Sequence, residues 1–419
     1  MSASNSNEFR SRPLGQALQE RALKVIPAGM WGHQRVAAMP SGYPQFFTGG
    51  KGARVTDVDG HEYIDFMCSW GPIILGHQHP EVEEAVAARW NRGDCLNGPT
   101  DQVVELAELL VNTIPMADWA MFQKNGCDAT TACVTIARAA TGKRKLLLAR
   151  GAYHGAVPWC SPSLVGVTAE DRAHILSFDY NNTESLAHAV AQAGDDLAAI
   201  LVAPFRHDLG IRQEEPTSEF VTAIRGHCDS TGAALVLDDV RAGFRLDLGG
   251  SWEPFGVRPD LAAYSKAIAN GHPLAAVVGN DRFREAAGQI FITGSFWYTG
   301  APMAAAIATI RELQKSGGPE LIQASGQRLR DGLQEQSLRH GFELTQSGPP
   351  AMPLLQFSRD HDARLGAAFC QEALSRGVYM HHRHNMFLST AHTFEEIDKA
   401  LEATDSAFSA LAKKRKAYE

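Results

Sequence analysis

The chain has 419 residues, 44% of them hydrophobic and 21% charged, so it is long enough for two globular domains with sizeable cores. Its formal charge of -8 at pH 7 argues against a nucleic-acid-binding protein, which normally presents a basic face. A membrane span needs roughly 18 uninterrupted apolar residues. Neither such a run nor an apolar signal core in the opening MSASNSNEFRSRP is present.

The cysteines indicate a reducing compartment. There are seven, an odd number without a CxxC pair, at Cys68, Cys95, Cys127, Cys133, Cys160, Cys228 and Cys370. This scattered pattern favours free thiols over disulfides or zinc ligands. We therefore expect a cytoplasmic protein that binds no metal, no nucleic acid and no membrane.

A stretch rich in Gly and Pro opens the chain and ends at about residue 55. Short apolar runs typical of buried strands then follow at AMFQ (120–123), KLLLA (145–149), LAAILVAPF (197–205), LVLDD (235–239), LAAYS (261–265) and LAAVVG (274–279). Helix-length amphipathic segments mostly separate these runs. The alternation predicts an α/β fold with a mostly parallel central sheet flanked by helices on both faces.

Two helical patterns lie beyond residue 305, at ELIQASGQRLRDGLQEQ (320–336) and FEEIDKALEATDSAFSALAKK (394–414). They predict a smaller second domain. We expect an N-terminal segment (1–55) that joins the small domain, a large domain (56–305) and a small C-terminal α+β domain (306–419).

Polar residues at the ends of apolar runs are the first candidates for chemistry, because ligands in open α/β sheets bind beyond the carboxyl ends of the strands. The run LVLDDV ends in Asp238 and Asp239, and LAAYSK ends in Lys266. An acid and a lysine would thus emerge at the same edge of the sheet. From this pair alone, a buried salt bridge and a catalytic pair are equally good interpretations.

A third candidate is the turn in FQKNGCDATTACVTIARAATG, where a strand end runs into Gly126 and Cys127 and then into a long helical segment. Backbone N–H groups at such a helix N-terminus are a ready site for phosphate. The segment ATGKRK is no P-loop, because it lacks the upstream glycine and a Ser or Thr after the lysine. In GAYHGAVPW, Tyr153 follows the strand KLLLA, where its ring would stack on a planar ligand or pack into the core.

A phosphate site, an aromatic ring, a carboxylate and a lysine on one sheet edge are the requirements for binding pyridoxal 5'-phosphate. Lys266 would form the Schiff base, and Asp238 would keep the pyridine nitrogen protonated. The lysine needs a lowered pKa, so that its free amine can attack an aldehyde. The same amine can then carry a proton between substrate and cofactor.

The motifs and their order along the chain resemble those of class III aminotransferases, which are fold-type I (aspartate aminotransferase-like) pyridoxal phosphate enzymes. The resemblance runs from about Ala22 to Thr404. SWGPIILGH (69–77), NGCDA, AYHG, LVLDDVRAGFR and PDLAAYSKAIANGHPLAAVVG are similar to the glutamate-1-semialdehyde aminomutase branch. A still closer resemblance, through ADWAMF, TGSFW and HNMFLS, is to fumonisin aminotransferases, which deaminate a long-chain amino-polyol with pyruvate as acceptor.

The resemblance implies the same roles for Lys266 and Asp238 and adds further cofactor contacts. These are Tyr153 and Val240 on the two faces of the ring, and the backbone of Gly126 and Cys127 at the phosphate.

The resemblance also implies a homodimer with composite active sites, in which the neighbouring chain completes the phosphate site. The threonine that usually does so is replaced by Trp297 in FWYTGAP, so either Ser295 or Thr299 is expected to supply the hydroxyl. Asp239 lies at the position where most of the class has a glutamate, whose side chain is one methylene longer than that of aspartate.

The substrate side departs from the aminomutase pattern. PAGMWGHQR has Arg35 where the family arginine binds a substrate carboxylate, and an exposed loop arginine is an equal alternative. The usual Glu-Pro pair is Ala203-Pro in VAPFRH, which leaves Arg206 and His207 as polar groups. His384 in HHRHN (381–385) aligns with a glutamate, and we interpret this cluster as pocket lining more readily than as a metal site. The candidate substrate-binding residues are Arg35, Ser69, Trp70, Arg206 and His384.

The favoured hypothesis is an ω-type aminotransferase. It would move an amino group from a primary amine, such as a bulky or long-chain amine like hydrolysed fumonisin, to a 2-oxo acid such as pyruvate in a ping-pong mechanism through Lys266. The alternative is an aminomutase or isomerase of an amino-aldehyde or amino acid, which would need no acceptor. A pyridoxal phosphate-binding protein without catalysis is a third interpretation.

Overall fold

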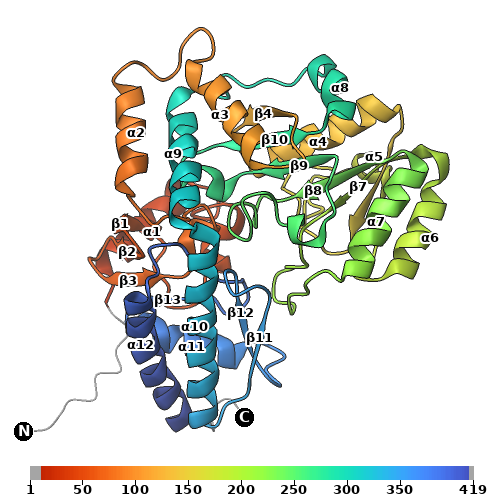
Figure 1. Ribbon diagram of the computed structural model, residues 1–419. Helices are drawn as coiled ribbons and strands as arrows, with labels where there is room; N and C mark the ends of the chain where they lie inside the picture. Colours follow the sequence, from red (N-terminus) through yellow and green to blue (C-terminus); the bar gives the residue numbers. More distant parts are fainter. Residues whose placement is uncertain (1–10, 415–419) are drawn as a thin grey trace, which may run out of the picture. The chain divides into compact units, whose positions relative to one another are not determined.

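The computed structural model describes residues 11–414, and Figure 1 labels their helices and strands. Residues 1–10 and 415–419 lie outside the described residues, and so does most of the segment in which a signal core was sought. The described chain divides into two compact units. The first comprises residues 11–70, 76–79 and 324–414, and the second comprises residues 71–75 and 80–323.

The second unit is built on a seven-stranded sheet with the order β4-β10-β9-β8-β7-β5-β6. The strands from β9 to β6 are parallel, whereas β10 is antiparallel to both of its neighbours. The strands are β4 (Trp119–Gln123), β5 (Lys145–Ala149), β6 (Ile175–Phe178), β7 (Leu197–Val202), β8 (Ala234–Asp238), β9 (Leu261–Tyr264) and β10 (Ala275–Gly279).

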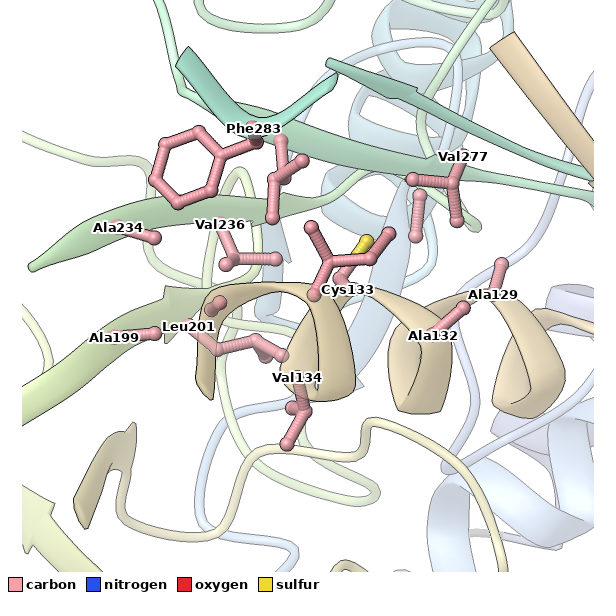
Figure 2. Packing of buried hydrophobic residues seen from close by; sticks show 14 of the residues in the cluster. Ala129, Ala132, Cys133, Val134, Ala199, Leu201, Ala234, Val236, Val277 and Phe283 are labelled. Carbon is pink, nitrogen blue, oxygen red and sulfur yellow. The ribbon is translucent and has the colours of Figure 1, made fainter. Parts of the chain in front are cut away.

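Helices flank this sheet. They are α2 (Pro80–Trp90), α3 (Asp101–Thr113), α4 (Gly126–Thr141), α5 (Ala169–Arg172), α6 (Thr183–Ala193), α7 (Ser218–Thr231), α8 (Arg284–Gln289) and α9 (Gly300–Ser316). Helix α4 packs its small apolar face on the strands, where Cys133 meets the side chains of Val236 and Val277 (Figure 2). Ala129 and Ala132 let the helix approach closely, so its N-terminal end is fixed at the sheet.

The predicted strands agree closely with the observed ones, and the predicted α/β fold with a mostly parallel, helix-flanked sheet is confirmed. The six apolar runs correspond to β4, β5, β7, β8, β9 and β10. Strand β6 was missed because its ILSF sequence is short and only its last residue is fully buried. The reversed direction of β10 was also missed, since an apolar run carries no information on strand direction.

The first unit holds a four-stranded sheet with the order β1-β2-β3-β13 and a two-stranded hairpin of β11 and β12. Its strands are β1 (Phe47–Lys51), β2 (Arg54–Asp57), β3 (Glu62–Asp65), β11 (Leu344–Ser347), β12 (Leu354–Phe357) and β13 (Val378–Tyr379). Its helices are α1 (Pro13–Val25), α11 (Arg364–Ser375), α12 (Phe394–Lys413) and most of α10 (Gly318–Arg339). An aromatic cluster of Phe342, Phe357, Phe369 and Phe408 lies in its core.

The boundaries between the units differ from the predicted ones at residues 55 and 305. Strands β2 and β3 belong to the first unit because they pair with β1 and with each other. Helix α9 belongs to the second unit because it packs on α2 and α3. Among residues 11–414, no helix is both long and apolar enough to cross a membrane, and no group of three or more acidic, histidine or cysteine side chains is arranged to hold a metal ion.

Candidate active site

The carboxyl ends of β8 and β9 open into a cavity of about 360 Å³ within the second unit. Asp238 ends β8, and Lys266 follows β9 after Ser265. The turn between β4 and α4 closes another side of the same cavity with Gly126 and Cys127. The predicted meeting of acid, lysine and glycine turn at one sheet edge is therefore present. The volume is within the range of about 300–1,000 Å³ that small-molecule sites occupy.

Lys266 is held in a strained position. Its φ of 47° lies in the left-handed region, which non-glycine residues adopt only when their surroundings impose it. Burial, aided by the guanidinium of Arg241, lowers the pKa of Lys266 from 10.5 to about 7, against the opposing effect of Asp238. At neutral pH, a large fraction of Lys266 is therefore uncharged, and the uncharged amine is the form that attacks a carbonyl carbon.

Asp238 is buried and is oriented by a histidine. Its Oδ2 lies 2.7 Å from Nδ1 of His154, which donates to the carboxylate, and its Oδ1 accepts from the backbone N of Val240 at 3.2 Å. The Nε2 of His154 is buried with no partner among the described residues. The carboxylate is thus fixed at the cavity wall with a hydrogen-bonded imidazole behind it.

Gly126 lets the turn approach Val240 closely because it has no side chain. A Cβ at Gly126 would lie 2.6 Å from Cγ1 of Val240, so only glycine fits against that valine. Asn125 caps α4, and its backbone N donates to Oδ2 of Asp128 at 2.9 Å. Tyr153, at 46% exposure, lines the same cavity as Val240.

Asp239 supports the loop that follows β8. It is buried, and its Oδ2 accepts from the backbone N of Ser251 at 2.9 Å while its Oδ1 accepts from the Ser251 hydroxyl. Burial raises the pKa of Asp239 to about 6. The shorter acid therefore has a hydrogen-bonding role within the second unit.

Several cavity-lining residues received no role in the sequence analysis, among them Lys124, His154 and Arg241. His207, named there only as a polar group near the substrate, also lines the cavity. Burial lowers the pKa of Arg241 to about 10, with Asp238 acting in the opposite direction. The signal for His154 was its place in AYHG, one residue after Tyr153. The signal for Arg241 was its position three residues beyond Asp238.

Three predicted residues of the second unit do not line this cavity. Arg206 donates from Nε to Asp208 at 2.8 Å and lies 3.8 Å from Glu214, so its guanidinium is engaged by two carboxylates. Ser295 is exposed, and Thr299 is buried, with its hydroxyl donating to the carbonyl of Phe296 at 2.9 Å. A substrate role for Arg206 and a cofactor role for the two hydroxyls stay predictions.

The remaining substrate-binding candidates lie in the first unit, and two of them meet there. The ring of Trp70 packs edge-on against His384 at 4.9 Å and against His33 at 4.8 Å between centroids. His384 donates from Nδ1 to the carbonyl of Asn385 at 2.7 Å.

Strain marks the same segment, because Cys68, Ser69 and Trp70 all have positive φ. Arg35 is exposed and has no ion-pair partner among residues 11–414. The roles of Arg35, Ser69, Trp70 and His384 in substrate binding stay predictions.

The cavity fits pyridoxal phosphate in its donor set and its shape. It offers a primary amine of lowered pKa at Lys266 and a buried carboxylate at Asp238, and it has a Cβ-free turn at the start of a 16-residue helix. These groups suit an aldehyde, a pyridine nitrogen and a phosphate. Together, the fold and the cavity define a fold-type I pyridoxal phosphate enzyme.

Comparisons with known proteins agree. A family model described as Aminotransferase class-III matches residues 37–408. The chain is 48% identical over 394 residues to the aminopentol aminotransferase of Sphingopyxis macrogoltabida, covering 94% of this chain and 93% of that protein. It is 34% identical over 415 residues to the glutamate-1-semialdehyde 2,1-aminomutase of Desulforudis audaxviator (strain MP104C). This match covers 92% of this chain and 95% of that protein.

A solved structure is also very similar, namely the pyridoxal phosphate internal aldimine form of the FumI protein of Sphingopyxis sp. MTA144. It matches with a TM-score of 0.95 and 46% identity over 97% of this chain and 98% of that chain. The chain belongs to the class III aminotransferases. The predictions of family, fold, cofactor and enzyme class are thereby confirmed.

Proposed function

We propose that this enzyme transfers the amino group of a long-chain or bulky primary amine to a 2-oxo acid such as pyruvate. The observation that carries the proposal is the 48% identity, along almost the whole chain, to an aminopentol aminotransferase. The engagement of Arg206 by Asp208 and Glu214 supports a donor without a carboxylate, because this guanidinium already has two anionic partners.

When bound, pyridoxal phosphate supplies an electron-withdrawing ring that stabilises negative charge at the substrate carbon. Asp238 would keep the ring nitrogen protonated, and its carboxylate is itself oriented by His154, whose Nδ1 lies 2.7 Å from Oδ2. Lys266 would hold the cofactor through Nζ, and its lowered pKa of about 7 would let the same amine accept and return a proton at neutral pH. Tyr153 and Val240 both line the cavity and would confine the ring from its walls.

The proposal is tested by incubating the purified enzyme with a panel of amines and either pyruvate or 2-oxoglutarate. The panel should include long-chain amines with and without hydroxyl groups. We expect alanine from pyruvate with at least one long-chain amine, and none from the Lys266→Ala variant. If no amine in the panel yields alanine or glutamate, the proposal is wrong.

An aminomutase is the second candidate, because the chain is also 34% identical to a glutamate-1-semialdehyde 2,1-aminomutase. The two functions differ in their need for an acceptor. Turnover of a single amino-aldehyde in the absence of any 2-oxo acid would favour the aminomutase. An absolute requirement for the acceptor favours the aminotransferase.

We further propose a cytoplasmic homodimer whose active sites use residues of both copies. The seven cysteines are free thiols in the described residues, as expected in a reducing compartment. Exposed aromatic side chains of the second unit support self-association, because Phe291 is 91% and Phe296 is 65% exposed.

A further inference from the structure

Lys124 occupies an unusual place for a charged side chain. It lies between the end of β4 and the start of α4, and it lines the cavity beside Asn125, Gly126 and Cys127. The strand end behind it is buried, since Phe122 is 7% exposed. A cation at this point therefore faces the end of the cavity that the glycine turn forms.

The ammonium group of Lys124 has one strong partner, and that partner is neutral. Its Nζ donates to the hydroxyl of Thr299 at 2.7 Å. A lysine ammonium carries three N–H donors, so two remain for other acceptors. Among the described residues, no carboxylate lies within ion-pair distance of it. Burial lowers the pKa of Lys124 to about 8, with Asp94 acting in the opposite direction.

The other cations of the cavity are balanced by a carboxylate. Asp238 acts electrostatically on both Lys266 and Arg241, whereas the carboxylate that acts on Lys124 is Asp94, which does not line the cavity. Lys124 is thus a cation at the glycine-turn end of the cavity, and among the described residues no carboxylate that lines the cavity forms an ion pair with it.

A cation beside this helix end would favour the binding of a doubly charged anion there. The first turn of α4 already carries the carboxylate of Asp128, which accepts from the backbone N of Asn125 at 2.9 Å. That carboxylate offsets the positive end of the helix dipole and repels a phosphate. An ammonium two residues before Gly126 compensates for this repulsion.

From these observations we infer that Lys124 is a phosphate-binding residue, whose ammonium group pairs with the cofactor phosphate next to the Gly126 turn. Backbone N–H groups at the turn fix the position of the phosphate, and Lys124 supplies the charge. The bond to Thr299 holds the flexible lysine stem in the direction of the cavity.

The test compares two ligands that differ only in the phosphate, pyridoxamine 5'-phosphate and pyridoxamine. Neither has an aldehyde, so Lys266 cannot bond to them covalently. Binding to the cofactor-free protein is measured by calorimetry. A charge-assisted hydrogen bond is worth about 1.5–3 kcal/mol, so we expect Lys124→Met to weaken pyridoxamine 5'-phosphate binding roughly 10–100-fold and pyridoxamine binding less than about twofold. Lys124→Arg should restore most of the loss.

Lys143→Met is the matched control, because Lys143 is a partly buried lysine that donates to a neutral acceptor, the carbonyl of Thr231, at 2.6 Å. It should leave both affinities unchanged. An equal loss of both ligands in Lys124→Met would assign Lys124 a structural role and overturn the inference, and so would an unchanged affinity for pyridoxamine 5'-phosphate.

A second measurement needs no variant that could fold poorly. Above pH 8 the unliganded Lys124 loses its charge, so the wild-type preference for pyridoxamine 5'-phosphate over pyridoxamine should fall as pH rises from 8 to 10. In Lys124→Arg the preference should fall much less between pH 8 and 9, because Arg241, the other cavity cation with a lowered pKa, titrates only near pH 10. A constant wild-type preference would count against the inference independently of any effect of mutation on stability.

Discussion

At the scale of single residues, Lys266 owes its chemistry to where the backbone puts it. Its positive φ and its burial both cost folding free energy. The burial also lowers the pKa of its ammonium group to about 7. A solvent-exposed lysine would be almost fully protonated at neutral pH and hence a poor nucleophile. The strained, desolvated position thus produces the reactive form of the side chain.

The first prediction concerns the pH dependence of cofactor capture. Below pH 7 the fraction of neutral Lys266 falls about tenfold per pH unit, so the rate at which cofactor-free enzyme binds pyridoxal phosphate covalently should rise with pH and level off above about 7. Arg241→Met removes a repelling cation and should move the midpoint to higher pH. The rate is followed by cofactor absorbance after mixing. A midpoint near 10 in the wild type would refute the prediction.

Asp238 supports a second prediction. In Asp238→Asn the amide keeps the shape of the side chain but loses the negative charge that holds the ring nitrogen protonated. We expect kcat/KM to fall by about 10²–10⁴ while the cofactor stays bound to Lys266. His154→Asn should have a smaller effect, because this residue acts through Asp238 at 2.7 Å. Full cofactor content, measured after alkaline release, separates lost catalysis from lost binding.

At the scale of elements, the turn that opens α4 depends on close contact with the loop after β8. Gly126→Ala would bring a Cβ to 2.6 Å from Val240 Cγ1, which must then move within the cavity wall. Overpacking of this kind costs about 1–3 kcal/mol, so we expect a lower unfolding temperature and weaker binding of pyridoxamine 5'-phosphate.

Two further variants test that mechanism. The double variant Gly126→Ala/Val240→Ala should recover part of the loss, because the smaller residue makes room for the added methyl group. Gly226→Ala is the control, since Gly226 lies inside α7 with nothing within 4 Å of an added Cβ, and it should be neutral or slightly stabilising. Failure of Val240→Ala to compensate would show that the clash is not with this side chain.

Some of the helices and strands were predictable from the sequence alone, and others were not. Buried parallel strands are continuous apolar runs, so β7 and β8 were predictable, and so was the emergence of Asp238 and Lys266 at one sheet edge. The half-exposed edge strand β6 lacks such a run. The hydrogen-bond and ion-pair partners of single side chains were not predictable either. Arg206 is drawn to Asp208 and Glu214 by loop geometry, and Lys124 resembles a solvated turn residue until its contact with Thr299 is seen.

At the scale of the whole molecule, the fold and cofactor are better determined than the substrate. Almost the entire chain matches both an aminopentol aminotransferase and an aminomutase, although these relatives have different reactions. The cofactor groups Lys266, Asp238 and Gly126 suit either reaction. Selectivity must therefore depend on residues outside this set, and the strained Cys68–Trp70 turn with His384 is the strongest candidate in the first unit.

The last prediction concerns assembly. Large exposed apolar side chains close together in the sequence favour an interaction surface, and the segment before α9 exposes Phe291 at 91% and Phe296 at 65%. We expect light scattering to give about twice the chain mass of 45.4 kDa. The double variant Phe291→Ser/Phe296→Ser should dissociate at low micromolar concentration and lose transaminase activity. Leu338→Ser, at a leucine of α10 that is 64% exposed, should do neither. A wild-type protein that stays monomeric at every concentration would rule out composite active sites, whereas a monomeric but fully active double variant would show that each chain holds a complete site.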